Sequence, residues 1–241
     1  MATKLLFKGL IIIFLFSLSS CIDWADDNIE GNDDVETEVR NIAGIVEVQS
    51  WGNFDVYINL ADTTTLRVEA EENLLRYIIT EVSGQKLTIE EKDGYDLENN
   101  RPMRIYISTP NLEEVTLGGS GSIECDSLSG DSFKAELLGS GKIEFNNLTV
   151  DDIEALIAGS GEIELEGDGK NSEFEIEGSG DIRAINFVHE DSECKIVGSG
   201  NIYVYATEFL RARITGSGTI YYEGNPDINE LITGSGDIRR Y

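Results

Sequence analysis

The sequence is poor in the residues that several classes of protein depend on. Among 241 residues there are 18 Lys and Arg against 46 Asp and Glu, a formal net charge of −28, with only three Pro, three Cys and one His. This acidic excess argues against nucleic-acid binding, because neutralising phosphate groups requires a basic surface. Three cysteines and one histidine are too few for a disulfide scaffold, a Cys-rich zinc site or a site built from several histidines.

Long apolar runs are also scarce, although hydrophobic residues make up 40% of the chain and suffice for a buried core. Lys4 and Lys8 flank the start of an apolar run, Leu10 through Phe16, that is too short to span a bilayer. This pattern is typical of an export signal over residues 1–20. The sequence Leu18-Ser19-Ser20-Cys21 resembles the lipobox of bacterial lipoproteins. The resemblance implies that Cys21 carries lipid and anchors the protein in the outer membrane, facing the cell surface or the periplasm.

Residues 21–41 are predicted to form a flexible acidic tether. Between Ile22 and Asn41 there are eight acidic residues and one basic residue, Arg40. Such a run repels itself and buries little surface. The simpler interpretation is a solvated spacer. Alternatively, Asp26 and Asp27 resemble the acidic signals that sort lipoproteins to the outer face of the membrane.

The rest of the chain is dominated by an internal repeat. Gly-Ser-Gly occurs seven times, at intervals of 20, 20, 19, 20, 18 and 18 residues, beginning at Gly119 and ending at Gly234. Four residues after the first Gly of each copy the residue is always Ile: Ile123, Ile143, Ile163, Ile182, Ile202, Ile220 and Ile238. Two residues before it stands Leu or Ile: Leu117, Leu137, Ile157, Ile176, Ile196, Ile214 and Ile232. A fixed period of this length is typical of a stacked repeat architecture.

The repeat favours a parallel β-helix over a meander of hairpins. Apolar residues alternate with polar ones around the two columns, as strands require. Successive parallel coils place like residues above one another about 4.8 Å apart, so the Ile column becomes a continuous stack. We therefore predict an all-β fold, a single right-handed parallel β-helix of about seven Gly-Ser-Gly coils over residues 42–241. Residues 42–112 are predicted to form an atypical N-terminal cap with degenerate coils, and residues 113–241 the regular repeats.

These repeats, preceded by the run Ile107-Ser108-Thr109-Pro110-Asn111-Leu112, resemble the autotransporter adhesin, head GIN domain family. The resemblance covers about residues 42–241. Members of that family resemble pectin-lyase-like β-helices, are often bacterial lipoproteins and have no established enzymatic activity. The resemblance implies a role in adhesion, with a glycan or a surface protein as the partner.

One outward-facing column is a candidate ligand strip. Five residues after the first Gly of each copy stand Glu124, Glu144, Glu164, Arg183, Tyr203, Tyr221 and Arg239. The plain interpretation is a solvated face. As a hypothesis, Tyr203 and Tyr221 stack against sugars, while the glutamates hold a cation or a basic partner, with Lys142 offsetting part of their charge. No catalytic residue, metal ligand or cofactor is assigned.

Four further expectations follow from the sequence. The residue after Gly-Ser-Gly is not consistently acidic, which argues against the calcium sites of β-rolls. Cys125 and Cys194 occupy inward columns four coils apart, about 19 Å along the axis, so we predict two buried free thiols rather than a disulfide. The single histidine, His189, is predicted to lie in a loop. The final apolar layer has no evident lid, which points to end-on self-association.

Two classes of function remain at this stage. A surface-anchored adhesion or interaction module fits the anchor and the repetitive rod. The alternative is a carbohydrate-active enzyme of the pectin-lyase type, or a glycan-binding protein, which needs a groove with suitably spaced acids or a basic residue beside a bound cation.

Overall fold

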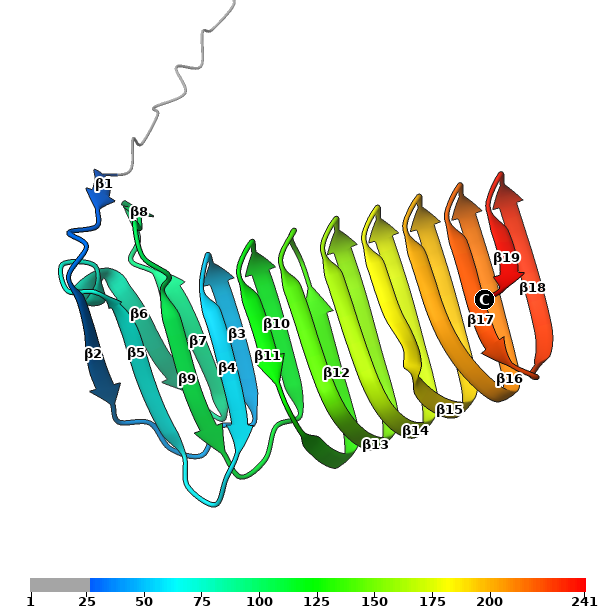
Figure 1. The fold of residues 1–241 in the computed structure, drawn as a ribbon, viewed down its shortest axis with the longest axis horizontal. Coiled ribbons are helices and arrows are strands. Elements are labelled where there is room, and N and C mark those ends of the chain that lie inside the picture. The colour runs from blue at the N-terminus through cyan, green and yellow to red at the C-terminus, as the bar shows by residue number, and fades with distance from the viewer. Residues whose placement is uncertain (1–26) are drawn as a thin grey trace, which may run out of the picture.

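The computed structural model describes residues 27–241, which fold into one long β-solenoid (Figure 1). Residues 1–26, including the predicted signal and Cys21, lie outside the described part. Its elements are β1 (Asp27–Glu30), β2 (Val35–Arg40), β3 (Glu47–Gly52), β4 (Asp55–Leu60), β5 (Thr65–Glu71), η1 (Leu75–Tyr77), β6 (Ile78–Ser83), β7 (Lys86–Glu91), β8 (Tyr95–Glu98), β9 (Arg104–Thr109), β10 (Glu114–Gly119), β11 (Ser122–Cys125), β12 (Leu128–Leu137), β13 (Lys142–Gly159), β14 (Glu162–Gly178), β15 (Asp181–Gly198), β16 (Asn201–Gly216), β17 (Thr219–Gly224), β18 (Asp227–Gly234) and β19 (Asp237–Arg240). No helix in residues 27–241 is long and apolar enough to cross a membrane.

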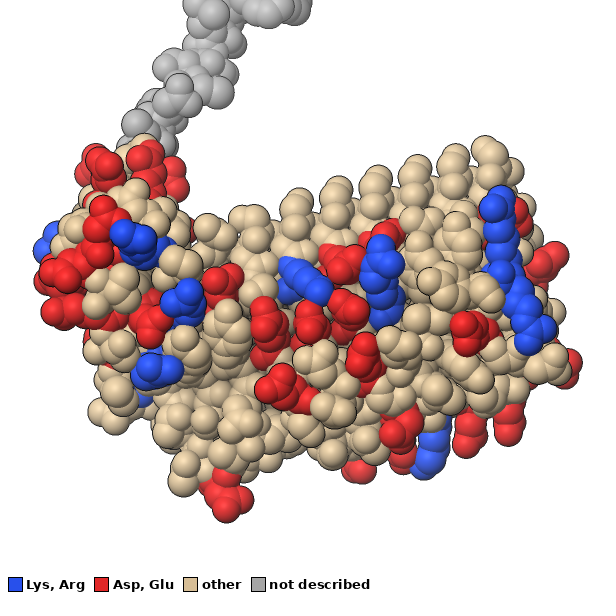
Figure 2. Space-filling view, viewed as in Figure 1, with Lys and Arg blue, Asp and Glu red and all other residues tan. Residues whose placement is uncertain are grey.

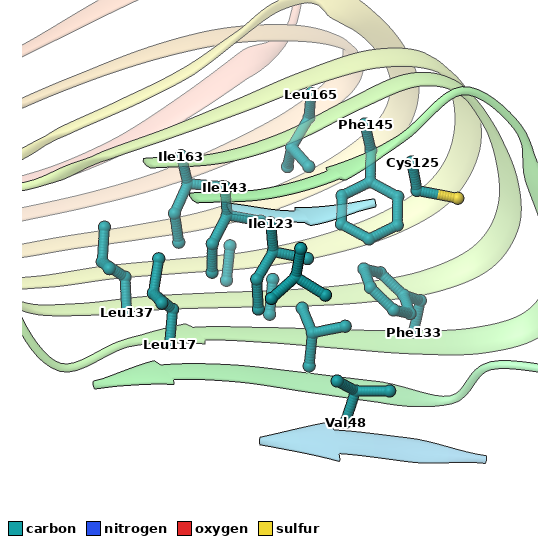
Figure 3. Packing of buried hydrophobic residues seen from close by; sticks show 14 of the residues in the cluster. Val48, Leu117, Ile123, Cys125, Phe133, Leu137, Ile143, Phe145, Ile163 and Leu165 are labelled. Carbon is teal, nitrogen blue, oxygen red and sulfur yellow. The ribbon is translucent and has the colours of Figure 1, made fainter. Parts of the chain in front are cut away.

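The predicted parallel stacking is confirmed residue by residue. From β11 to β19 every coil pairs in parallel with the next, and Ile123, Ile143 and Ile163 are aligned across successive strands. The same column continues through Ile182, Ile202, Ile220 and Ile238. Figure 3 shows Ile123, Ile143 and Ile163 projecting into the core opposite Leu117 and Leu137. Burial of these aligned columns supplies the hydrophobic stabilisation that no single coil could supply alone.

The glycines of the repeat lie where successive turns approach most closely. Gly178 has a φ of +139°, and a Cβ at this position would lie 2.3 Å from the carbonyl oxygen of Gly159 in the preceding coil. Both features exclude an L side chain. The stacking of the coils therefore requires glycine at this position of the repeat.

The coils at the N-terminal end are not stacked in chain order. β3 pairs in parallel with β10 on one side and with β7 on the other, while β4 lies between β11 and β9. The layer of β3 and β4 thus separates two layers that follow it in sequence (Figure 1). Residues 42–112 contain these two coils together with antiparallel strands, in which β5 pairs with β9 and β6 with β7.

The prediction of a flexible tether over residues 21–41 is wrong for its described part. β1 pairs in parallel with β8, and β2 pairs antiparallel with β5 across Val35–Arg40. Arg40 donates hydrogen bonds to the carbonyl oxygens of Ile78 and Leu75, at 2.6 and 2.9 Å. These backbone pairings outweigh the mutual repulsion of the acids, so residues 27–40 complete the N-terminal cap.

The cap depends on one buried carboxylate. Glu71, which is fully buried, accepts hydrogen bonds from the backbone N–H groups of Asp33 (2.6 Å), Asn100 (2.8 Å) and Arg101 (3.2 Å). Burial raises the pKa of Glu71, but these donors outweigh it and hold the pKa below its ordinary value. Glu71 therefore joins β5 to two segments far from it in the sequence.

Candidate functional site

The seven residues of the predicted ligand strip are aligned in one continuous outward ladder. Parallel register aligns the seven residues in the predicted order, Glu124, Glu144, Glu164, Arg183, Tyr203, Tyr221 and Arg239. The ladder also extends toward the N-terminal end, where Glu124 is aligned with Tyr57, Tyr57 with Tyr106, and Tyr106 with Arg67. A pair of tyrosines next to an arginine therefore occurs at both ends of the acidic section.

The acidic section of the ladder is held by two cations from the same face. The Lys142 ammonium lies 2.7 Å from Glu144 and 2.8 Å from Glu164, and these hydrogen bonds raise the pKa of Lys142. Arg183 contacts Glu162 at 2.6 Å. Glu124 forms no ion pair within residues 27–241, and its pKa is raised by burial and by the nearby charge of Glu144. Figure 2 shows acidic and basic side chains gathered in the middle of one long face.

The tyrosine rings of the ladder stack against one another. The rings of Tyr203 and Tyr221 are stacked with centroids 4.8 Å apart, and the Arg183 guanidinium lies 5.0 Å from the centroid of Tyr203 on the side of the preceding coil. At the other end Tyr106 lies between Tyr57, at 5.3 Å, and Arg67, at 3.9 Å. A sugar could stack on Tyr203 only by displacing a neighbour. The ladder therefore offers ring edges, hydroxyls and charges; its role in ligand binding stays a prediction.

A separate groove, which the sequence analysis did not find, runs along the solenoid on a different set of columns. It has a volume of about 690 Å³ and crosses β12 to β16, with its ends near β3, β10 and β16. β12, β13, β14 and β15 each contribute two outward residues as walls and one inward residue as the floor, and β16 contributes two wall residues. The lining residues are Glu47, Glu113, Glu114, Ser132, Phe133, Lys134, Asp152, Ile153, Glu154, Asn171, Ser172, Glu173, Asp191, Ser192, Glu193, Phe209 and Arg211.

The walls of this groove are strongly acidic. Eight of the lining residues are Asp or Glu and two are Lys or Arg. Arg211 pairs with Glu193 and Lys134 approaches Glu154, whereas Glu114, Glu173 and Asp191 form no ion pair in the described part of the chain. Burial raises the pKa of Glu114. The groove thus concentrates negative potential along a narrow path, which favours a positively charged occupant.

The floor of the groove carries a chain of hydrogen bonds. Ser172 Oγ lies 2.9 Å from His189 Nε2 and 2.8 Å from Ser192 Oγ. His189 Nδ1 lies 3.0 Å from the carbonyl oxygen of Phe187, which can only accept, so Nδ1 carries the proton and Nε2 accepts from Ser172. Ser192 then donates to Ser172. Burial raises the pKa of the Cys194 thiol to about 12, so this neutral thiol can donate across the 3.4 Å to Ser192.

The prediction that His189 lies in a loop is wrong. His189 belongs to β15 and is 2% exposed, packed against Phe174 and Phe187. The register between β15 and β16 shifts on both sides of it. Those irregularities reverse the alternation of inward and outward residues, which turns the imidazole into the core. Burial lowers its pKa to about 4, so the ring is neutral at physiological pH.

Ser172 and His189 have the geometry of a nucleophile and its base, but the surroundings do not complete a catalytic site. Acyl transfer also needs free N–H donors for an oxyanion, whereas Ser172 lies inside two continuous parallel ladders, between Ile153 and Ser192. A backbone carbonyl, not a carboxylate, orients the histidine. Among residues 27–241 no group of three or more His, Cys, Asp or Glu side chains could hold a metal ion.

The predicted buried free thiols are confirmed for Cys125 and Cys194. Cys125 lies beside Phe145 in the core (Figure 3), and Cys194 belongs to the hydrogen-bonded chain below the groove. The residues that line the groove lie outside the columns aligned on Gly-Ser-Gly, so the repeat did not indicate them. The change from Phe133 and Ile153 to Ser172 and Ser192 along one aligned inward column could have indicated it.

The family follows from comparison of the whole sequence. Residues 46–226 match the family described as "Putative auto-transporter adhesin, head GIN domain". The chain belongs to this family. The resemblance inferred from the repeats is thereby confirmed, and membership in the head GIN family suggests a role at the cell surface. No curated protein matches the chain.

Solved structures share the head GIN fold over most of the chain. A putative lipid binding protein from Parabacteroides distasonis is 32% identical, with a TM-score of 0.76 over 89% of this chain and 100% of that one. A putative adhesin from the same species is 25% identical, with a TM-score of 0.73 over 89% and 100%. A putative adhesin from Bacteroides fragilis is 24% identical, with a TM-score of 0.85 over 88% and 100%, and shows the fold alone.

Proposed function

We propose that this protein is an outer-membrane lipoprotein, anchored by lipid on Cys21, whose solenoid is a non-catalytic adhesion module exposed at the cell surface. The head GIN family and the lipobox-like sequence before Cys21 support this proposal. The observation that carries the binding role is the acidic groove over β12 to β16, because it is continuous across five strands and eight of its lining residues are acidic. The occupant we propose is a basic, extended segment of a surface protein.

Charge and shape both favour such an occupant. A peptide in extended conformation lies along the axis of the groove and presents Lys or Arg to either wall, where Glu114, Glu173 and Asp191 have no cationic partner in the described chain. Glu114 is half-buried, which strengthens its contact with a cation relative to one on an open surface, while Glu173 and Asp191 are exposed and open to the occupant. The ladder of Glu124 to Arg239 is a weaker candidate, because Lys142 and Arg183 already neutralise part of it.

The groove is tested with a matched pair of triple variants. Glu114→Gln, Glu173→Gln and Asp191→Asn remove three charges from the groove. Asp62→Asn, Glu81→Gln and Asp93→Asn remove three exposed charges from the N-terminal part of the solenoid, outside the groove lining, so both variants have the same net charge. Binding of a fluorescent lysine decamer is followed by anisotropy. We expect the groove variant to lose about tenfold or more in affinity, the value of one good charged contact. Equal losses in the two variants would mean that only net charge attracts the peptide.

Anchoring and exposure are tested separately. An alkyne-palmitate label should enter the wild-type chain and not Cys21→Ser. Protease treatment of whole cells should degrade the wild-type protein while a periplasmic marker survives. Survival of the protein in intact cells would place it on the periplasmic side. Loss of the label with retained surface exposure would contradict lipid as the anchor.

A carbohydrate-active or other hydrolytic enzyme is the alternative function, and the pairing of Ser172 with His189 is the observation that favours it. The enclosed hydroxyl and the engaged backbone around it argue against turnover. The test is hydrolysis of a panel of acidic and neutral polysaccharides, together with labelling by a fluorophosphonate. Turnover or labelling that is lost in Ser172→Ala would overturn the non-catalytic assignment. Binding of a polysaccharide without turnover would instead identify a glycan as the ligand.

A further inference from the structure

One end of the solenoid is capped by other strands, and the other end is open. At the N-terminal end, antiparallel strands β2, β5 and β6 cover the first parallel coils. At the other end, β18 and β19 form the last coil and pair with β16 and β17 on one side. Within residues 27–241 no strand pairs with their other side, so their outward backbone groups lie open (Figure 1). Such an edge is a template for a further strand.

The apolar columns continue into this last coil without a cover. Leu231, which lies outside these columns, is 61% exposed, and the column residues Ile228 and Ile232 are 38% and 37% exposed. The residues below the last two, Leu210 and Ile214, are fully buried or nearly so. Ile228 and Ile232 would reach the same burial if one more layer were added. We call residues 227–241 the tip.

The charge of the tip differs from that of the rest of the protein and favours a particular partner. The whole chain has a net charge of −28, but the tip contains three acidic residues, Asp227, Glu230 and Asp237, against Arg239 and Arg240. Two copies of so acidic a protein repel each other over most of their surface. At the tip that repulsion nearly vanishes, and each copy offers both signs of charge to the other.

We propose that the tip binds the tip of a second copy in a two-fold arrangement. A two-fold axis between the tips makes the facing strands antiparallel, which satisfies their open backbone groups, and it buries the same side chains on both copies. A head-to-tail arrangement would instead place the tip on the antiparallel cap, whose edge strand β2 carries Glu36 and Glu38. It would also grow into filaments.

Pairing of the tips would make a second copy the partner in adhesion, and this role rests on the proposed function. Asp27 and β1 lie at the capped end, opposite the tip (Figure 1). An anchor at Cys21 would therefore direct the tips away from the membrane, so that copies on facing cells meet. The contact of one coil is small, so we expect weak pairing in solution that many copies on a surface reinforce.

The test is sedimentation equilibrium of the full chain carrying Cys21→Ser at physiological salt. We expect a monomer–dimer equilibrium and no larger species. Ile228→Glu with Ile232→Glu should weaken dimerisation at least tenfold, whereas Val35→Glu with Val39→Glu, apolar residues at the capped end that are more exposed, should leave it unchanged.

Three results would overturn the proposal. They are a wild-type chain that stays monomeric up to about 1 mM, equal weakening by both double variants, and growth into long oligomers. The wild-type measurement does not depend on whether a variant folds. Because it needs neither lipid nor the groove, its failure is distinguishable from failure of the proposed function. Vesicles bearing the lipidated chain should cluster only if both the anchor and the tip act as proposed.

Discussion

Ser172 donates its hydroxyl proton to Nε2 of His189 across 2.9 Å, directly beneath the acidic groove. Because Nδ1 of the same ring donates to the Phe187 carbonyl, the direction of every hydrogen bond from Cys194 to Phe187 is determined. This chain of hydrogen bonds gives the buried neutral imidazole partners at both ring nitrogens.

The buried histidine predicts an acid-dependent loss of stability. Its pKa of about 4 lies below its ordinary value of 6.5, so on acidification the unfolded chain binds the proton first. The stabilisation is complete above pH 6.5 and is lost as the pH falls toward 4, by about 3 kcal/mol in total. Urea unfolding of the wild type and of His189→Gln at pH 7.5, 5.5 and 4.5 measures it, because the two chains share every carboxylate. Parallel pH profiles would contradict this prediction.

The buried carboxylate of Glu71 predicts selective loosening of the cap. Glu71→Gln keeps the size of the side chain but removes the charge that accepts three backbone N–H groups, at an expected cost of about 2 kcal/mol or more. Amide exchange in β1 and β2 should accelerate, and the neighbouring Glu72→Gln, which is exposed, serves as the control. Since the pKa of Glu71 is lowered, its contribution is lost as the pH falls below its ordinary range. The same exchange rates in both variants would mean that the carboxylate does not hold the cap.

The repeat glycines predict a sharp contrast between two substitutions. Gly178→Ala should cost about 3 kcal/mol or more, or abolish folding, because a Cβ there would lie 2.3 Å from a carbonyl oxygen at a φ of +139°. Gly130→Ala, where the nearest atom lies 3.9 Å away, should change stability by less than about 1 kcal/mol. Thermal unfolding compares the two variants. Tolerance of alanine at Gly178 would show that the coils are not in the close contact described.

The ladder predicts that Lys142 contributes more to the stability of the fold than its position on the surface suggests. Lys142→Gln leaves Glu144 and Glu164 aligned in adjacent coils without their shared partner. We expect a loss of about 1 kcal/mol at low salt that diminishes as the ionic strength rises. Lys170→Gln, which removes a lysine paired only with Asp151, should have a smaller effect. A salt-independent loss would indicate packing, not charge, as the cause.

The sequence alone determined the repeating part of this protein. A period close to 20 residues, with Ile123 and its equivalents at one position, predicts parallel coils because only parallel stacking places like on like. The same logic aligned Glu124 through Arg239. Tyr57 and Tyr106 were missed because their coils lack Gly-Ser-Gly and do not stack in chain order.

Only the tertiary structure decided the rest. The insertion of β3 and β4 between two later layers, the ordering of residues 27–40 by Glu71, and the inward turn of His189 depend on contacts between segments far apart in the sequence or on local register shifts. A one-residue shift reverses which side chains face the core, and no periodic pattern records where it occurs. The groove arises for the same reason, since its walls and floor come from neighbouring coils and not from any one repeat.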